Sequence, residues 1–168
     1  MSDGPHTPHP PETLLSLLDA ATESVLAEFR RDLEEAGYAD IRPTHGCVFR
    51  FVRDDGMRLT ELAGLAGMTK QSVGELVDDL VDLGYVERIP DPEDRRAKLI
   101  CLTDRGREAQ ATGFALFAEV ERQWIERYGV ERWEAMRALL EEIVATEAPA
   151  SVPELEREEL AELNLQTA

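Results

Sequence analysis

Three basic residues, Arg95, Arg96 and Lys98, lie close together in the stretch RIPDPEDRRAKLICLT, residues 88–103. A guanidinium group presents its N–H donors in a planar fork, which suits phosphate groups and the edges of nucleic-acid bases. The whole chain carries a formal net charge of −17, which argues against unspecific attraction to polyanions. A group of cations in so acidic a chain therefore indicates one local contact with a negatively charged partner.

The residues around this basic group predict a β-hairpin. The segments YVERI (85–89) and KLICLT (98–103) have the composition of strands, and the intervening PDPEDRRA is typical of a turn-rich loop. A hairpin loop can lay an arginine into the minor groove of DNA, where narrow A·T stretches concentrate negative potential. The same pattern also fits an ordinary surface hairpin with exposed ion pairs, which contribute little to stability.

Within the hairpin we expect two acidic residues, Asp91 and Asp94, to orient the loop arginines through carboxylate–guanidinium pairs. Such pairs would hold the loop in shape before any partner binds. Arg88 and Lys98 lie at the ends of the strands, where we expect them to face a nucleic-acid backbone.

Two short helices are predicted just before the hairpin. Thr60 and Thr69 are expected to cap them, and Gly67 permits the sharp turn between them. The second helix, residues 69–83, has an apolar side centred on Leu80 and a polar side opposite. Two such helices followed directly by a hairpin predict a winged helix-turn-helix.

The first turn of the second helix carries Thr69, Lys70, Gln71 and Ser72. A glutamine can pair with adenine, a lysine with guanine or phosphate, and hydroxyl groups with either. The amino-terminal end of a helix also favours phosphate. These four residues are therefore predicted to contact DNA, although Thr69 and Ser72 can equally serve as capping residues.

Farther along the same helix the polar side is acidic, with Glu75, Asp78, Asp79 and Asp82. Carboxylates near phosphates weaken binding unless they accept a hydrogen bond from cytosine N4 or pair with a neighbouring cation. Glu75 is included among the predicted DNA contacts on that ground. The alternative is an acidic winged-helix module that binds another protein and has weak or no affinity for DNA.

Long helices are predicted on both sides of this region, and the fold class is therefore mainly α, as α+β. We expect Thr103 to cap the helix that follows the hairpin and Gly129 to end it. A winged helix closes its own core, so wide apolar stripes on additional helices of about 25 residues must be buried elsewhere. A second copy of the chain, with the first and last helices interleaved across a two-fold axis, satisfies this requirement. We therefore expect a homodimer.

The segment from Leu59 to Glu108, LTELAGLAGMTKQSVGELVDDLVDLGYVERIPDPEDRRAKLICLTDRGRE, resembles the MarR family of transcriptional regulators. The resemblance rests on the helix pair, the D-x-x-D-R-R-A-K wing and the Leu-Thr-x-x-Gly entry to the next helix. It implies a homodimer that binds a pseudo-palindromic operator, commonly as a repressor, and is released by a small aromatic or phenolic ligand or by thiol oxidation. It also implies that Asp94 and Arg96 form the wing pair.

The sequence departs from the usual pattern of this family at two positions of the second helix. Gly74 stands where a hydroxyl residue is common, and Glu75 where a basic residue is common. Residues 57–107 carry eight basic and ten acidic residues, a net charge of −2, so the remaining −15 lies on the flanking segments. This distribution predicts strongly salt-dependent DNA binding with little unspecific affinity.

The chain is thus expected to comprise five parts. They are a disordered leader, a dimerisation helix, a winged helix-turn-helix, further dimerisation helices and an acidic tail, at residues 1–11, 12–37, 41–103, 104–148 and 149–168.

An effector site is expected between the dimerisation helices and the winged region, near Tyr38, His45 and Phe49. His45 could pair with a carboxylate of a ligand, but interfacial packing explains the same three residues. Cys47 and Cys101 could sense oxidants if their thiolates were accessible and stabilised. Free cysteines of this kind commonly pack as small apolar residues instead.

No enzymatic activity, metal or cofactor is expected. The sequence has no phosphate-binding loop, no His/Cys cluster with metal-ligand spacing and no Ser-His-Asp arrangement. It also has no signal peptide and no apolar stretch of about 18 residues, so no membrane association is expected. Two cysteines do not make a disulfide framework, and a reducing cytoplasm is the expected compartment.

Overall fold

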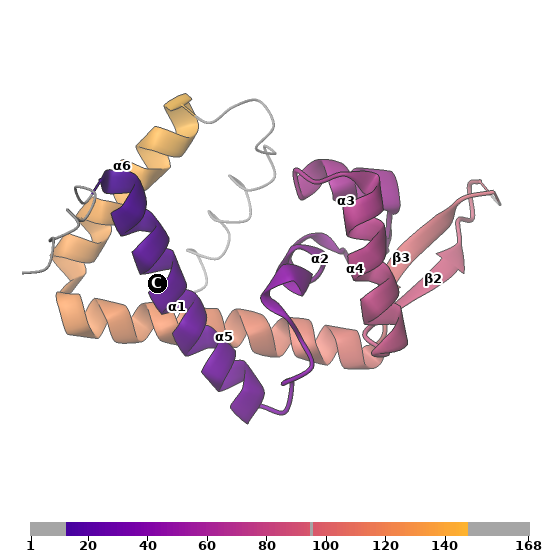
Figure 1. Cartoon of the computed structure of the whole chain (residues 1–168), viewed down its shortest axis with the longest axis horizontal. Coiled ribbons are helices and arrows are strands. Elements are labelled where there is room, and N and C mark those ends of the chain that lie inside the picture. Colours follow the sequence, from indigo (N-terminus) through magenta and orange to yellow (C-terminus); the bar gives the residue numbers. More distant parts are fainter. Residues whose placement is uncertain (1–12, 95, 148–168) are drawn as a thin grey trace, which may run out of the picture.

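A computed structural model describes residues 13–94 and 96–147, and Figure 1 shows the arrangement of its elements. The predicted leader at 1–11, the acidic tail at 149–168 and Arg95 lie outside the described residues. In chain order the elements are α1 (Leu14–Glu35), the short 3-10 helix η1 (Pro43–His45), α2 (Gly46–Phe51), β1 (Met57–Arg58), α3 (Leu59–Leu65), α4 (Lys70–Asp82), β2 (Val86–Pro90), β3 (Lys98–Leu102), α5 (Asp104–Tyr128) and α6 (Val130–Glu147).

The predicted fold class is confirmed: the described chain is mostly helical and carries a small antiparallel sheet. The strand order is β1-β3-β2, with Val86 opposite Leu102 and Pro90 opposite Lys98 in the hairpin. The third strand, β1, pairs Met57 with Ile100 and was not predicted. Two residues are too short to show the alternating pattern that identifies a strand.

A continuous apolar core lies between α2, α3, α4 and the sheet. Its fully buried members come from every one of these elements, and the largest are Val48, Met57, Leu62, Val73, Val77, Leu80, Tyr85, Val86 and Ile100. The apolar side of α4 is directed into this core, as predicted from the spacing around Leu80. The opposite side of α4 is therefore free to carry polar residues.

The helix ends follow the predicted caps at two positions and differ at a third. Thr69 caps α4 by accepting from Ser72 N, and Thr103 caps α5 by accepting from Gly106 N. The prediction for Thr60 is wrong, because α3 begins at Leu59 with Arg58 at its N-cap. There the chain passes straight from strand β1 into the helix, so no side-chain cap separates the two.

The three long helices form the other half of the molecule (Figure 1). In this view α1 crosses α5, and α6 turns away from the end of α5 at Gly129, whose φ of +90° is accessible to glycine. The rings of Phe29 and Phe117 stack between α1 and α5 with centroids 3.9 Å apart. None of the helices in the described ranges is long and apolar enough to cross a membrane.

Candidate nucleic-acid interface and ligand cavity

The first turn of α4 presents the residues predicted to contact DNA. The backbone N–H of Ser72 donates to Thr69 Oγ1 over 3.1 Å, so Thr69 acts as a cap here, and Ser72 is half-buried. Lys70 and Gln71 are exposed. Gln71 Nε2 donates to Glu75 Oε1 over 3.3 Å, so the exposed Glu75 carboxylate is partly occupied by its neighbour on the same helix.

The tip of the hairpin lies at the same end of the winged region as the first turn of α4. In Figure 1 both point away from α5, and the long helices lie on the far side of α4. Arg96 and Lys98 are exposed on the hairpin. The geometry therefore places two exposed basic residues of the hairpin and one of α4, Lys70, toward one end of the winged region.

Asp91 organises the base of the hairpin, but its partner differs from the predicted one. Its buried carboxylate accepts from the backbone N–H groups of Glu93 (2.8 Å) and Asp94 (3.3 Å). It also accepts from Arg58, whose Nε and Nη2 lie 2.7 and 2.6 Å from Oδ2. The backbone donors and Arg58 lower the pKa of this carboxyl group. The guanidinium that Asp91 holds is thus on β1, and the predicted pairing with a loop arginine is corrected accordingly.

Asp94 also contacts the loop differently from the expected pair. Its Oδ1 accepts from the backbone N–H of Arg96 over 3.0 Å, which is a local side-chain turn rather than a carboxylate–guanidinium pair. The reason is geometric, because a short aspartate side chain readily reaches the N–H two residues along the chain. This contact leaves the guanidinium of Arg96 exposed.

Arg88, which we expected to face a nucleic-acid backbone, forms an ion pair within the protein. Its guanidinium pairs with Asp78 of α4, and only 28% of its side chain is exposed. A second acidic residue of α4, Asp79, pairs with Arg42 of the segment after α1. Two of the acidic residues that raised doubt about DNA binding are therefore neutralised by arginines from neighbouring elements.

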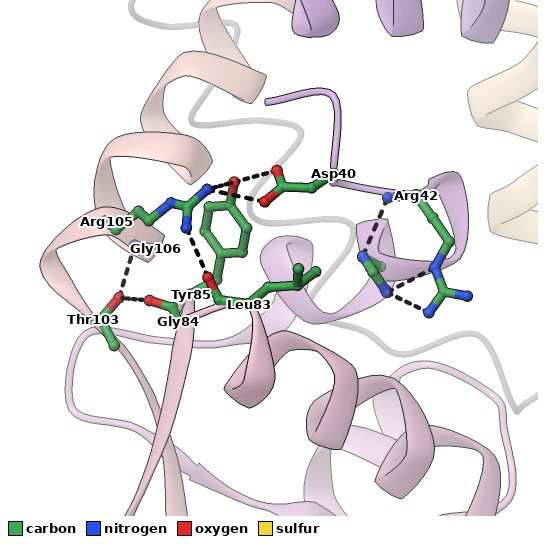
Figure 2. Close-up of polar contacts among 9 residues, drawn as sticks. Asp40, Arg42, Leu83, Gly84, Tyr85, Thr103, Arg105 and Gly106 are labelled. Carbon is green, nitrogen blue, oxygen red and sulfur yellow. Dashed lines mark hydrogen bonds and ion pairs between the residues drawn. The ribbon is translucent and has the colours of Figure 1, made fainter. Parts of the chain in front are cut away.

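A polar junction joins the carboxyl end of α4 to the start of α5 (Figure 2). The Tyr85 hydroxyl donates to Asp40 Oδ1 over 2.6 Å, and Arg105 Nη2 donates to Asp40 Oδ2 (3.0 Å) and to the Tyr85 oxygen (2.8 Å). The Arg105 guanidinium also lies over the Tyr85 ring, 4.2 Å from its centroid. Burial and the Asp40 carboxylate raise the pKa of Tyr85 to about 12, so the hydroxyl remains a donor.

The same junction satisfies the last carbonyl groups of α4. Arg105 Nη1 donates to Leu83 O over 2.8 Å, and Thr103 Oγ1 donates to Gly84 O over 2.7 Å. Helix carboxyl ends expose unpaired carbonyls that favour positive charge. The first turn of α5 therefore holds α4 at its carboxyl end.

His45, predicted to meet a ligand, is fully buried beneath α4. Its Nδ1 lies 3.2 Å from the backbone N of Arg42, and Arg42 Nε donates to its Nε2 over 3.3 Å. Nε2 lies 3.0 Å from a guanidinium nitrogen of Arg42 and 3.8 Å from Asp79 Oδ2. Burial and Arg42 lower the pKa of His45. The Asp79 carboxylate thus lies beside both the Arg42 guanidinium and the His45 ring.

A cavity of about 660 Å³ lies between α1, α2 and α5. Its wall is mainly apolar and includes three arginines but none of the acidic residues that the structure describes. It is formed by Leu26, Phe29, Arg30, Leu33, Ile41, Arg42, Pro43, Gly46, Cys47, Phe49, Arg50, Phe51, Leu65, Ala66, Ala109, Gln110, Gly113, Phe114 and Phe117. Of the predicted effector residues, Phe49 belongs to this wall. Tyr38 and His45 do not; Tyr38 packs beside Tyr85, with ring centroids 6.3 Å apart.

Neither cysteine is set up as a reactive thiolate. Cys47 is half-buried in the cavity wall and its Sγ donates to Thr44 O over 3.4 Å. Cys101 is buried in β3. Burial raises the pKa of both thiols, which opposes the ionisation that oxidant sensing requires.

Several residues at these sites were not predicted from the sequence: Asp40, Arg42, Arg58, Asp79 as an internal ion-pair partner, and Arg105. Each acts through a partner far along the chain, as in the Arg42–Asp79 and Arg58–Asp91 pairs. Periodicity and local motifs report neighbours within a few positions, and they carried no signal for these pairs.

Comparison with known proteins agrees with this geometry. The sequence model described as MarR family matches residues 39–97, from the segment after α1 to the hairpin. The HTH-type transcriptional regulator PetP of Rhodobacter capsulatus is 30% identical over 106 residues, which is 56% of this chain. The match spans 63% of PetP, somewhat less than two thirds of its length.

Two solved structures share the fold over most of the chain. The transcriptional repressor CouR bound to a 23-mer DNA duplex is 26% identical, with a TM-score of 0.63 over 79% of this chain and 92% of CouR. CouR from Rhodococcus jostii RHA1 bound to p-coumaroyl-CoA is 25% identical, with a TM-score of 0.62 over 82% of this chain and 94% of CouR. Sequence, helix order and wing agree, and the chain is similar to winged-helix regulators of the MarR family.

Proposed function

We propose that the protein is a homodimeric transcriptional regulator that binds a pseudo-palindromic DNA operator. The observation that carries this proposal is the common orientation of the exposed first turn of α4 and the hairpin tip, at the end of the winged region remote from α5 (Figure 1). A recognition helix enters the major groove with its amino-terminal residues, and a wing reaches the adjacent minor groove or backbone. Lys70 and Gln71 would read bases, and Arg95, Arg96 and Lys98 would contact the backbone and minor groove.

The local charges support this function despite the acidic chain. Asp78 and Asp79 are each paired with an arginine, and Glu75 is engaged by Gln71. Two of the four acidic residues on the polar side of α4 are therefore compensated by cations within the protein. This arrangement favours DNA over an acidic surface that binds another protein.

The long helices support a dimer. Large apolar side chains are exposed along α1, α5 and α6, among them Leu14, Leu15, Leu17, Leu18, Phe114, Phe117, Met136, Leu139, Leu140, Ile143 and Val144. An apolar surface of this extent is unfavourable in water and favours association. A second copy of the chain buries the same residues symmetrically and separates two recognition helices by about one turn of DNA.

We further infer that the regulator acts as a repressor in the cytoplasm and is released when a small apolar ligand, aromatic or carrying an aromatic group, fills the cavity beneath α1. Phenylalanine rings and aliphatic side chains form most of the cavity wall, which fits such a ligand. The relatives support a non-enzymatic function, since one is a transcriptional regulator and another a repressor bound to DNA. We expect no catalytic activity.

The proposal is tested by selecting genomic DNA fragments that the full-length protein retains. The expected result is one enriched inverted repeat with half-sites about one helical turn apart. Affinity is then measured by fluorescence anisotropy at several salt concentrations, for the intact protein and for the double variant Arg95→Ala/Arg96→Ala. We expect the variant to lose about tenfold or more in affinity and to show a smaller salt dependence.

The matched control removes two arginines from the long helices, as Arg31→Ala/Arg122→Ala, which changes the net charge by the same amount. Both are exposed and pair with acidic residues of their own helices. This control should retain operator affinity. Equal losses in the two variants would contradict a specific role of the wing, and absence of any enriched palindrome would favour the protein-binding alternative.

A further inference from the structure

Arg42 lies at the boundary between the ligand cavity and the recognition helix. It belongs to the wall of the cavity, and its guanidinium pairs with Asp79 of α4. More than half of its side chain remains exposed, so the guanidinium is not enclosed by the core. Figure 2 shows Arg42 on the segment that leads from Asp40 toward α2, beside the junction that holds the end of α4.

Arginine is the charged residue type that the described chain contributes to the cavity wall. Three arginines, Arg30, Arg42 and Arg50, belong to it, and none of the described aspartates or glutamates does. An apolar space bordered by guanidinium groups favours a ligand with an apolar body and one anionic group, because a guanidinium binds carboxylate, sulfonate or phosphate oxygens through paired donors.

The arginines differ in what an anion would displace. Arg30 pairs with Glu23 on its own helix, α1, and its Nε donates to Leu26 O. Arg42 pairs with Asp79, and the ring of the buried His45 lies beside the same carboxylate. A ligand anion at Arg42 would therefore compete with a carboxylate of the recognition helix, whereas an anion at Arg30 would compete only within α1.

We propose that an anionic ligand in the cavity binds Arg42 in exchange for Asp79, and that this exchange transmits ligand binding to the recognition helix. The inference rests on the proposed function for its DNA consequence, but not for the exchange itself. When Arg42 turns to the ligand, Asp79 loses its ion-pair partner and faces a second negative charge nearby. Both changes favour a displacement of α4 from the position that Arg42 holds.

Because binding at coupled sites is thermodynamically linked, the exchange can be measured as a change in ligand affinity. If Asp79 and the ligand compete for one guanidinium, removing the charge of Asp79 must strengthen ligand binding, and removing Arg42 must weaken it. The effect must require the negative charge of the ligand. A neutral ligand of the same shape would gain nothing from the Asp79 substitution.

The probe is 1-anilinonaphthalene-8-sulfonate, and its neutral counterpart is N-phenyl-1-naphthylamine, which lacks the sulfonate. Both fluoresce when they enter an apolar site. The cavity signal is defined as the fluorescence lost in Gly113→Leu, which places a branched side chain in the cavity wall. If Gly113→Leu removes no signal from either probe, the cavity does not accept an apolar anion and the proposal is overturned.

For the sulfonate probe we expect Arg42→Gln to lower the affinity about tenfold and Asp79→Asn to raise it about threefold to tenfold. Neither substitution should change the affinity for the neutral probe. In the double variant Arg42→Gln/Asp79→Asn, the gain from Asp79→Asn should vanish, because the shared partner is absent. In Arg30→Gln/Asp79→Asn the gain should persist, which makes Arg30→Gln the matched control.

Operator affinity supplies the second measurement. Saturating sulfonate probe should weaken operator binding of the wild-type protein about tenfold and should have no such effect on Asp79→Asn. An unchanged or lowered probe affinity in Asp79→Asn, or equal gains for both probes, overturns the exchange. If the exchange is observed and operator binding ignores the probe, the transmission to α4 is overturned. If no operator is found, the proposed function fails while the probe results still decide the exchange.

Discussion

The winged region buries its apolar side chains in a core of its own, whereas the three long helices leave many of theirs exposed. The winged region buries side chains from α2, α3, α4 and all three strands in one continuous core. In α6 none of the residues with a described side chain is buried, and α1 buries only Leu33. Yet α6 exposes Met136, Leu139 and Ile143, which are as apolar as the core residues.

This difference shows that apolar content alone does not tell where a core lies. A short helix such as α3 meets neighbours on several sides, since the chain turns back at Gly67 and again at the hairpin. A straight helix of 25 residues such as α5 outruns the elements that could cover it. The winged region therefore closes a core through its own contacts, whereas the long helices keep large apolar side chains that the rest of the described chain does not cover.

The largest expected effect comes from equal truncations in the two regions. Leu80→Ala empties a fully buried position, and we expect the free energy of unfolding to fall by about 2–5 kcal/mol. Leu139→Ala, at a position 57% exposed, should instead weaken the dimer. Urea denaturation at several protein concentrations separates them, because only the second effect should depend on concentration. A concentration-independent loss at Leu139 would contradict its assignment to a dimer interface.

A smaller effect is expected from two glycines of α5. A Cβ at Gly106 would lie 2.0 Å from Tyr85 O, so Gly106→Ala must separate α5 from the end of α4, and we expect a loss of about 1–3 kcal/mol. A Cβ at Gly113 would meet only Phe29 Cζ, at 3.9 Å. Gly113→Ala should therefore stabilise the helix by about 0.5–1 kcal/mol. Thermal unfolding of both variants measures the contrast, and similar values for the two would refute it.

The smallest expected effect is a dependence of stability on pH that comes from His45 in the winged region. The pKa of His45 is lowered in the folded protein, so between the folded and unfolded values the unfolded chain binds the additional proton. The free energy of unfolding that depends on a neutral His45 is thus fully present above the pKa of unfolded histidine, about 6.5. It is lost as the pH falls below that pKa. The pH dependence of Tm just below this value should be weaker in His45→Gln.

Acidic residues provide the internal control for this titration. The pKa values of Asp40 and Asp91 are also lowered, and their stabilisation is lost only as the pH falls below about 4, the range of unfolded aspartate. Both proteins should therefore lose stability alike in that lower range. Identical curves for wild type and His45→Gln between the two ranges would mean that His45 takes no part.

Much of the fold could be predicted because it follows from local rules. The caps at Thr69 and Thr103, the break at Gly129 and the apolar side of α4 depend on residues within one or two turns of each other. The strand β1 was missed because it contains only two residues, and Thr60 was mistaken for a cap because the strand leads directly into α3. Neither feature leaves a periodic pattern in the sequence.

The candidate site was predicted less completely, since its ion pairs join distant segments. The exposed residues of the first turn of α4 follow from the helical wheel. The choice of partner does not: Asp91 is near Asp94 and Arg96 in sequence, but the fold brings it to Arg58 on the strand next to β3. The sequence likewise indicates acidic excess on α4 without indicating that Arg88 and Arg42 neutralise Asp78 and Asp79.

The contacts of Arg105 join the start of α5 to the end of α4, so a tilt of α5 would displace α4. Because Arg105 and Thr103 donate to the carbonyls of Leu83 and Gly84 just after α4, we expect α4 to move with the first turn of α5, a helix of 25 residues. At about 1.5 Å per residue this helix is about 37 Å long, so a tilt of about 5° at Gly129 carries its far end about 3 Å. In the proposed dimer, the two-fold axis repeats this tilt in both copies. The distance between the two α4 helices then changes by up to twice that amount. A tilt too small to disturb either apolar core would thus be enough to change the spacing of the two α4 helices, so that it no longer matches one turn of DNA.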